Sequence, residues 1–530
     1  MALPIAGLSL GFCTLFATMV LWPHAYSLAA LLIAYTPSIQ AATLPVRDST
    51  SNGLLVDTSV GKVQGFYNNT QQTVRAFLGV PYAAAPSGSR RFLPPATRAK
   101  SSSTIKATAW PAACPGIYPN ATTIYSILPY LPFTPEDEDC LTFNIWAPSA
   151  ARMKKLGNKP LPVVMYFYGG SWTQGATSIS TYEATNLVEN HDVVVAMPNY
   201  RVSIFGSPNS PYLYNKGGAQ NVGLLDQRFA IKWLQKNVHA FGGDSKRMIA
   251  FGQSAGSGSL DLYGFAYPKD PILTGTGLLS ASSLLPVYNN ELPQGNFTDL
   301  ANNVGCTGSN DEKIFKCMQQ VPFATLTSFI NNHPEKGYLF RLTVDNITVF
   351  TDQLERISSG RVAKIPQFGG QLDDEGTSLV AFSPDGIDQA AADVFTNAII
   401  KCPASREDKA RVDAGLTTYR YRYSGVYPNL SPYSFLGAYH TSDVPMWLGS
   451  VNVVPGLKEQ TTSEQKKQSA YMQGAVVAFA YDPKDGLAKY GWPKYQAEKG
   501  KTLVHLDPRN SAEVVVFENP AEFDAPCTST

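Results

Sequence analysis

The hydrophobic positions follow two distinct patterns beyond residue 160. The runs Val163–Phe167 and Val193–Met197 are continuously apolar, which is typical of strands buried on both faces of a sheet. From Leu224 to Val238 the apolar residues instead recur every three or four positions, which predicts an amphipathic helix. The strand-like run Arg247–Phe251 follows this helix. Strand, helix and strand in this order predict a βαβ unit, and hence a mainly parallel sheet with helices on both faces.

The region before these strands has a different texture. Between residues 50 and 100, short β-type runs such as Gly61–Phe66 alternate with turns rich in Gly and Pro, which predicts antiparallel edge strands. The chain contains no internal repeat and no long linker. We therefore expect a single α/β domain from about residue 43 to residue 530.

The first 42 residues have the composition of a targeting segment. Ile5–Leu21 is apolar, Leu28–Ala34 is apolar again, and the first charged side chain is Arg47. Ala41 and Ala42 are small residues at a plausible cleavage point, so residues 1–42 are predicted to be a signal peptide, although the basic start of such a peptide is missing. A membrane anchor is the alternative, because Ile5–Leu21 nearly reaches the length that spans a bilayer.

Composition narrows the functional classes. A formal net charge of +1 with 16% charged residues gives no basic surface for nucleic acid. The six cysteines beyond the leader are consistent with export, where disulfides form. Their number alone allows fifteen pairings and assigns none of them. Export would also fit the predicted N-glycosylation sequons. These sequons are at Asn68, Asn120, Asn296, Asn346 and Asn429.

The strongest chemical signal lies directly after the strand Arg247–Phe251. Residues Gly252–Gly256 form a G-x-S-x-G motif with Ser254 at its centre, and a helix-compatible stretch follows. A strand, a sharp turn with flanking glycines and a helix are the parts of a nucleophile elbow, which lifts the serine hydroxyl clear of the sheet. A Gly/Ser-rich loop is the alternative interpretation of this segment.

A serine hydroxyl needs a base and a carboxylate to become a nucleophile. An imidazole removes the proton near neutral pH, and the carboxylate holds the ring in the correct tautomer. The chain has only six histidines, so the candidates are few. They are His24, His191, His239, His333, His440 and His505.

Several ordered blocks resemble the type B carboxylesterases, the cholinesterase-like family of α/β-hydrolases. Residues Phe77–Ala83 look like the amino-terminal signature of that family, and Glu138–Trp146 matches its E-D-C-L-x-x-N-x-W block. Asn221–Gln227 and Phe241–Asp244 then lead into the Ser254 motif in the family order. The resemblance covers nearly everything after the leader and looks closest to fungal secreted members. It implies an α/β-hydrolase fold.

The resemblance also implies a catalytic triad. His440 lies in a loop that is similar to the catalytic-histidine loop of the family, and Glu375 matches its acid block D-E-G-[ST]. Ser254, Glu375 and His440 then occur in the chain order of α/β-hydrolases. Asp443, three residues after the histidine, is a rival for the acid.

The family's oxyanion hole maps onto Gly170, Ser171 and Ala255. Backbone N–H groups at these positions would stabilise the alkoxide that develops during acyl transfer. The family has glycine where this chain has Ser171, which adds a Cβ and a hydroxyl beside the reacting carbonyl. This departure is expected to narrow the acyl side of the site.

The resemblance further implies the disulfides Cys114–Cys140, Cys306–Cys317 and Cys402–Cys527. Cholinesterases carry a tryptophan in the first of these loops and often a glutamate before the serine, and both favour quaternary ammonium groups. This chain has no tryptophan between Cys114 and Cys140 and has the neutral Gln253 before Ser254. Choline esters are therefore not the expected substrates.

Together these features predict a secreted, glycosylated serine carboxylesterase without a metal or organic cofactor. Its partner would be a small neutral ester with a short or medium acyl chain. A secreted lipase is the enzymatic alternative. A catalytically silent, cholinesterase-like binding protein is the other alternative, because the same fold hosts both roles.

Overall fold

The structure is a computed structural model. It describes residues 52–118, 124–126, 128, 131–286, 295–452, 460–509 and 511–529. The predicted leader and the sequon at Asn120 lie outside the described residues. Asp48–Thr530 forms one compact unit. Among the described helices, none is both long and apolar enough to cross a bilayer.

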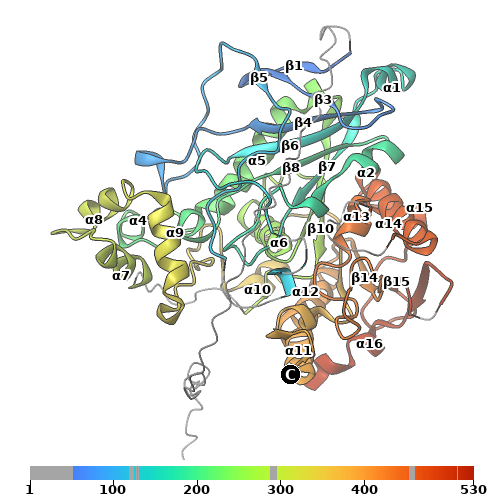
Figure 1. The fold of residues 1–530 in the computed structure, drawn as a ribbon. Coiled ribbons are helices and arrows are strands. Elements are labelled where there is room, and N and C mark those ends of the chain that lie inside the picture. Colours follow the sequence, from blue (N-terminus) through green and yellow to red (C-terminus); the bar gives the residue numbers. More distant parts are fainter. Residues whose placement is uncertain are drawn as a thin grey trace, which may run out of the picture. The chain divides into compact units, whose positions relative to one another are not determined.

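An eleven-stranded sheet runs through the centre of the described chain (Figure 1). Its strand order is β16-β15-β14-β11-β10-β9-β7-β8-β6-β4-β3. In chain order these strands are β3 (Phe66–Tyr67), β4 (Val74–Pro81), β6 (Thr142–Pro148), β7 (Leu161–Phe167), β8 (Val194–Pro198), β9 (Gly243–Gln253), β10 (Gly275–Leu279), β11 (Gln367–Leu372), β14 (Thr418–Tyr423), β15 (Leu503–Leu506) and β16 (Val515–Glu518).

The sheet is parallel from β8 to β15 and antiparallel at both ends. Every residue of β7 and of β8 is buried, as expected for strands covered on both faces. The two predicted apolar runs and the strand before Ser254 are thus β7, β8 and β9. The remaining strands form two small sheets, one of β1 (Leu55–Thr58), β2 (Gly61–Gln64) and β5 (Ile105–Lys106) and one of β12 (Phe382–Ser383) and β13 (Gly386–Ile387).

Helices flank this sheet (Figure 1). In chain order they are α1 (Ala150–Lys155), α2 (Thr185–Asn190), α3 (Ser203–Gly206), α4 (Pro211–Asn215), α5 (Val222–Asn237), α6 (Ala255–Ala266), α7 (Gly295–Asn303), α8 (Asp311–Met318), α9 (Phe323–Asn332), α10 (Gln353–Ser358), α11 (Gln389–Val394), α12 (Cys402–Asp413), α13 (Val444–Leu448), α14 (Ser463–Tyr481), α15 (Gly486–Tyr490) and α16 (Pro520–Phe523). The predicted amphipathic helix is α5, and the stretch after Ser254 is α6. These features establish the α/β-hydrolase architecture that the resemblance implies.

Aromatic residues join the helices to the sheet. Trp233 of α5 stacks on Phe143 of β6 with ring centroids 5.5 Å apart. Phe479 of α14 meets Phe368 of β11 edge to face at 4.9 Å. Such pairs add to the stabilisation that the buried apolar area already provides.

A second apolar cluster lies beside the sheet, where Figure 1 shows α4, α7, α8 and α9 together on one side. Phe92, Phe297 and Phe315 are its centre. The disulfide Cys306–Cys317 joins the segment that follows α7 to α8. The other two disulfides, Cys114–Cys140 and Cys402–Cys527, also form in the predicted pairing.

Candidate active site

Ser254 lies at the sharp turn between β9 and α6. Its backbone has φ 54° and ψ −123°, a strained conformation for a residue with a side chain. The turn is tight because Gly252 and Gly256 nearly touch: a Cβ on Gly252 would lie 2.6 Å from the carbonyl carbon of Gly256. The close approach of the backbone therefore requires glycine at both positions, and the predicted strand, sharp turn and helix around Ser254 are present.

The loop that follows β10 supports the elbow from behind. The amide N–H of Ser254 donates to the carbonyl of Leu279 at 2.9 Å. The hydroxyl of Ser257 donates to the carbonyl of Ala281 at 2.6 Å. These bonds tie the start of α6 to the end of the neighbouring strand, so the position of Ser254 depends on residues 279–283.

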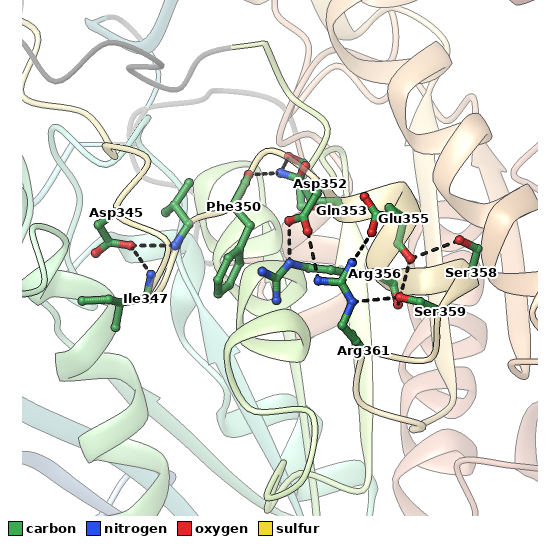
Figure 2. Close-up of polar contacts among 12 residues, drawn as sticks. Asp345, Ile347, Phe350, Asp352, Gln353, Glu355, Arg356, Ser358, Ser359 and Arg361 are labelled. Carbon is green, nitrogen blue, oxygen red and sulfur yellow. Dashed lines mark hydrogen bonds and ion pairs between the residues drawn. The ribbon is translucent and has the colours of Figure 1, made fainter.

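Helix α10 holds the same loop from its other side. Gln353 donates from Nε2 to the carbonyl of Ser283 at 3.2 Å. Figure 2 shows how this end of the helix is fixed: Arg356 and Arg361 both donate to the carboxylate of Asp352, at 2.6 and 3.1 Å. Asp352 and Arg356 are half-buried and Arg361 is exposed. Ion pairs at a protein surface stabilise a fold by only about 0–1 kcal/mol, so we assign these two pairs a local role at the helix start that carries Gln353.

Beside the elbow, the loop after β7 presents backbone N–H groups. Gly170, Ser171 and Trp172 have φ values of 113°, 55° and 59°, so three consecutive residues adopt the left-handed region. The carbonyl of Gly170 accepts hydrogen bonds from Thr173 and Gln174 and closes the turn. Among the described residues, no group accepts a hydrogen bond from the backbone N–H of Gly170, Ser171 or Ala255. The backbone N–H groups of all three positions are therefore not used within the described fold, and Gly170 and Ser171 also line the cavity described below.

The structure brings His440 and Glu375 into direct contact. Nδ1 of His440 lies 2.6 Å from Oε2 of Glu375, and both side chains are buried. Glu375 begins a short 3₁₀ turn after β11, and its other oxygen accepts the N–H of Leu372 at 2.9 Å. The hydroxyl of Tyr125 donates to the carbonyl of His440 at 2.9 Å. The carboxylate thus favours the tautomer in which Nδ1 carries the proton.

The other imidazole nitrogen faces a neighbour that the sequence did not indicate. Nε2 of His440 lies 3.0 Å from Nε2 of Gln253. No hydrogen bond joins the hydroxyl of Ser254 to His440 among the described residues. Catalytic hydrogen bonds are often loose before substrate binds, so Ser254 and His440 remain compatible as nucleophile and base.

A cavity of about 200 Å³ opens over these groups. Ser254, His440, Gly170 and Ser171 line it together with aromatic and amide side chains that include Tyr118, Tyr125, Tyr182 and Gln253. Among the described residues of this lining, none is Asp, Glu, Lys, Arg or Trp. The cavity is small compared with drug-binding pockets of about 300–1,000 Å³, and apart from the imidazole its described wall cannot carry charge.

Comparison with known proteins shows the family of this chain. The model of the carboxylesterase family matches residues 52–391. The chain belongs to the carboxylesterase family. A chlorogenic acid esterase of Aspergillus niger is 37% identical over 502 residues, which cover 91% of this chain and 95% of that protein.

Two further relatives extend across nearly the whole chain. Secreted lipase 5 of Gibberella zeae is 31% identical over 521 residues, covering 92% of this chain and 96% of the relative. A para-nitrobenzyl esterase of Bacillus subtilis is 26% identical over 507 residues, covering 88% and 96%. This member of the carboxylesterase family is therefore a carboxylic ester hydrolase.

The rival acid of this carboxylesterase has other partners. Asp443 accepts from the hydroxyl of Tyr421 at 2.9 Å and from the indole of Trp447 at 3.0 Å. Burial raises the pKa of Asp443 to about 6, and its hydrogen bonds to these two side chains oppose the shift. The structure thus joins His440 to Glu375 and holds Asp443 away from the ring nitrogens.

The carboxylesterase contains a second Ser–His–Glu arrangement that the motifs did not indicate. Ser424 contacts Nε2 of His505, and Nδ1 of His505 lies 2.7 Å from Oε1 of Glu518. Ser424 is only 1% exposed, and none of the described cavities reaches it. Hydrolysis needs access for an ester, so we interpret this arrangement as a structural link across β14, β15 and β16.

The predicted sequons differ in accessibility. Asn346 is exposed, whereas Asn68 and Asn296 are half-buried. Asn429 is 3% exposed, and its amide donates to the carbonyl of Val451, so the fold leaves no room for a glycan there. Tertiary packing rather than the tripeptide decides this burial, and glycosylation of the other sequons stays a prediction. Among the described residues, no group of His, Cys, Asp and Glu is arranged to hold a metal ion.

Proposed function

We propose that the protein hydrolyses esters through a covalent acyl-enzyme formed on Ser254. The single observation that carries this proposal is the shared cavity, which the strained Ser254, the imidazole of His440 and the loop of Gly170 and Ser171 all line. Glu375 holds the opposite nitrogen of that imidazole. Each of these parts is needed for acyl transfer, and their coincidence at the end of β9 supports a catalytic role.

The first half of the reaction forms the acyl-enzyme. Ser254 attacks the carbonyl carbon of the ester with Oγ while Nε2 of His440 accepts the hydroxyl proton. The former carbonyl oxygen becomes negatively charged and accepts hydrogen bonds from the N–H groups of Gly170, Ser171 and Ala255. Each such donor stabilises the transition state by about 3–4 kcal/mol. The imidazolium then donates its proton to the departing alcohol oxygen, and the carbonyl re-forms as an ester of Ser254.

The second half repeats these steps with water. His440 accepts a proton from a water molecule whose oxygen attacks the acyl carbon, and the same N–H groups stabilise the second oxyanion. The carboxylic acid leaves when Ser254 recovers its proton from the imidazolium. Glu375 stabilises the imidazolium throughout and remains ionised.

The proposed substrate is a compact neutral ester. Apart from the imidazole of His440, the described cavity wall offers no acidic or basic side chain to pair with a charged substrate. Its small volume and the hydroxymethyl group of the exposed Ser171 favour short acyl chains over long ones. Tyrosine rings in the lining also suit a planar aromatic acyl group, and one relative is named a chlorogenic acid esterase.

A lipase remains the second candidate, because one relative is named a secreted lipase. The two candidates differ in their response to chain length and to an oil surface. We expect p-nitrophenyl acetate and butyrate to be cleaved faster than p-nitrophenyl palmitate, and butyrylthiocholine no faster than an uncharged thioester of equal size. A preference for emulsified long-chain triacylglycerol, or for the choline ester, would overturn the proposed substrate class.

The departure at Ser171 allows a matched test within the same site. Ser171 has a left-handed φ of 55°, a conformation that glycine adopts at no steric cost. Ser171→Gly should retain the N–H donor, widen the acyl side, and raise the rate on longer acyl chains relative to acetate. An unchanged chain-length profile would show that Ser171 does not limit the acyl group.

A silent binding protein would lack this chemistry, and the intact set of Ser254, Glu375 and His440 argues against it. We further propose that the enzyme acts outside the cell. Three disulfides are typical of proteins from oxidising compartments, and one relative is named as secreted. Detection of the enzyme in the culture medium, with an amino terminus near residue 43, would test export and leader cleavage together.

A further inference from the structure

The side chain of Gln253 contacts the ring nitrogen of His440 that would act as the base. Nε2 of Gln253 lies 3.0 Å from Nε2 of His440, the nitrogen that has to accept the serine proton. The opposite nitrogen of the ring is held by Glu375 at 2.6 Å. The imidazole is therefore fixed at both nitrogens, and in the resting enzyme the amide of Gln253 competes with Ser254 for Nε2.

The amide is buried and tightly confined. Gln253 is 1% exposed and is the last residue of β9. A Cβ on Gly169 would lie 2.7 Å from Oε1 of Gln253 and 2.9 Å from Cβ of Ser254, so the oxyanion loop packs directly on both residues. Among the described residues, nothing donates a hydrogen bond to Oε1 of Gln253. A buried amide oxygen gains from a donor, so Oε1 of Gln253 is able to accept a hydrogen bond from another group of the site.

The proton movement of the reaction supplies such a partner. When His440 is neutral, Glu375 accepts from the Nδ1 proton and Nε2 is an acceptor, so only the NH₂ group of Gln253 suits it. When His440 has taken the serine proton, Nε2 becomes a donor, and the NH₂ group would oppose it. Half a rotation of the terminal amide of Gln253 brings Oε1 to Nε2 instead and removes this conflict.

We propose that Gln253 is a positioning residue for His440, which donates to the neutral imidazole at rest and accepts from the imidazolium during the reaction. This inference rests on the proposed function, because it assigns His440 the role of base. A carboxylate at this position could only accept and would favour the charged ring at all times. An apolar side chain of the same length could do neither.

Other ionisable and polar groups near the imidazole of His440 are the same in the wild-type protein and in each variant at position 253. Glu375 contacts Nδ1 of His440. The charge of His440 lowers the pKa of Asp443, and the hydroxyl of Tyr421 donates to Asp443. Tyr125 binds the carbonyl of His440. Because these groups stay unchanged, a difference in the titration of His440 between variants belongs to the side chain at 253.

The test compares Gln253→Glu and Gln253→Met with the wild-type protein. Proton NMR of the downfield Nδ1–H resonance follows the protonation of His440 directly and is recorded in the Ser254→Ala background. This titration does not depend on ester hydrolysis, so it distinguishes failure of this inference from failure of the proposed function. Steady-state kinetics of a p-nitrophenyl ester with Ser254 present then separates kcat from KM. Thermal melts show that each variant is folded.

We expect Gln253→Glu to raise the titration midpoint of His440 by about one pH unit or more, since a nearby negative charge favours the imidazolium. We expect Gln253→Met to lower kcat about 10- to 100-fold with little change in KM, as for a lost hydrogen bond to a charged group. A midpoint in Gln253→Glu equal to that of the wild type, or a wild-type kcat in Gln253→Met, would overturn the proposal. If Gln253→Met does not fold, the titration of Gln253→Glu decides alone.

Discussion

Replacing Gly256 with alanine would place a methyl group in the narrow space between the elbow and the oxyanion loop. A Cβ at this position would lie 2.6 Å from the carbonyl oxygen of Tyr168 and closer still to that of Phe167. Cβ contacts below 3.0 Å are essentially never observed, so the carbonyl oxygen of Tyr168 would have to withdraw from the new methyl group by at least about 0.4 Å, and that of Phe167 by more. The clash is with backbone atoms, which cannot rotate away as a flexible side chain can.

The displaced backbone leads directly into Gly170 and Ser171. Their N–H groups would then move relative to Ser254, and misplacement of reacting groups by about 1 Å costs about 100-fold in rate. Loss of one oxyanion donor costs about 10²- to 10³-fold in kcat. We therefore expect Gly256→Ala to lower kcat about 100-fold or more and to reduce the free energy of unfolding by about 1–3 kcal/mol through overpacking.

Gly264, also in α6, provides the matched control. A Cβ there meets only Cγ2 of Val362 at 3.7 Å, an ordinary contact. Gly264→Ala should leave kcat unchanged and stabilise the helix by about 0.5–1 kcal/mol. Hydrolysis of p-nitrophenyl butyrate and urea unfolding measure both quantities in both variants. Wild-type kcat and stability in Gly256→Ala would refute the reasoning that links the elbow to the oxyanion loop.

Two further predictions concern stability. The bridge Cys402–Cys527 closes a loop across 125 positions, so replacing both cysteines by alanine should lower the free energy of unfolding by at most about 4–5 kcal/mol, measured in urea; no loss at all would contradict the chain-entropy argument. Burial raises the pKa of Asp408 to about 7, against the opposing effect of Arg420. The folded protein therefore binds this proton more tightly than the unfolded chain, and the contribution is lost as pH rises through about 7. Urea unfolding should show stability increasing from about pH 7.5 to about pH 5, and Asp408→Asn should flatten that rise; an unchanged pH dependence in the variant would remove Asp408 as its cause.

Features that are contiguous in the chain were predictable. The elbow needs only a strand, two close glycines and a helix in sequence, and Gly252 and Gly256 reveal it without tertiary information. The strands β7 and β8 were recognisable because burial on both faces leaves only apolar residues. The proposed acid and base, Glu375 and His440, were identified from family blocks, since their contact spans 65 residues and no local rule gives it.

Features that arise from packing between distant segments were not predictable. Gln253 and His440 are 187 residues apart, and the sequence gives no sign that the amide reaches the ring. Strand register places His505 opposite Val516, and Glu518 lies near the end of the same strand, which the sequence pattern does not indicate. The burial of Asn429 has the same origin. In each case the position of a side chain follows from how whole strands and loops pack.

The central claim is that Ser254 is the nucleophile, and covalent labelling tests it most directly. The enzyme is treated with a fluorophosphonate and digested, and mass spectrometry locates the modified residue. We predict a single label on Ser254, its loss in His440→Ala, and full labelling and activity in Ser424→Ala, the control from the buried second arrangement. A label on Ser424, or undiminished labelling and hydrolysis in Ser254→Ala, would contradict the account.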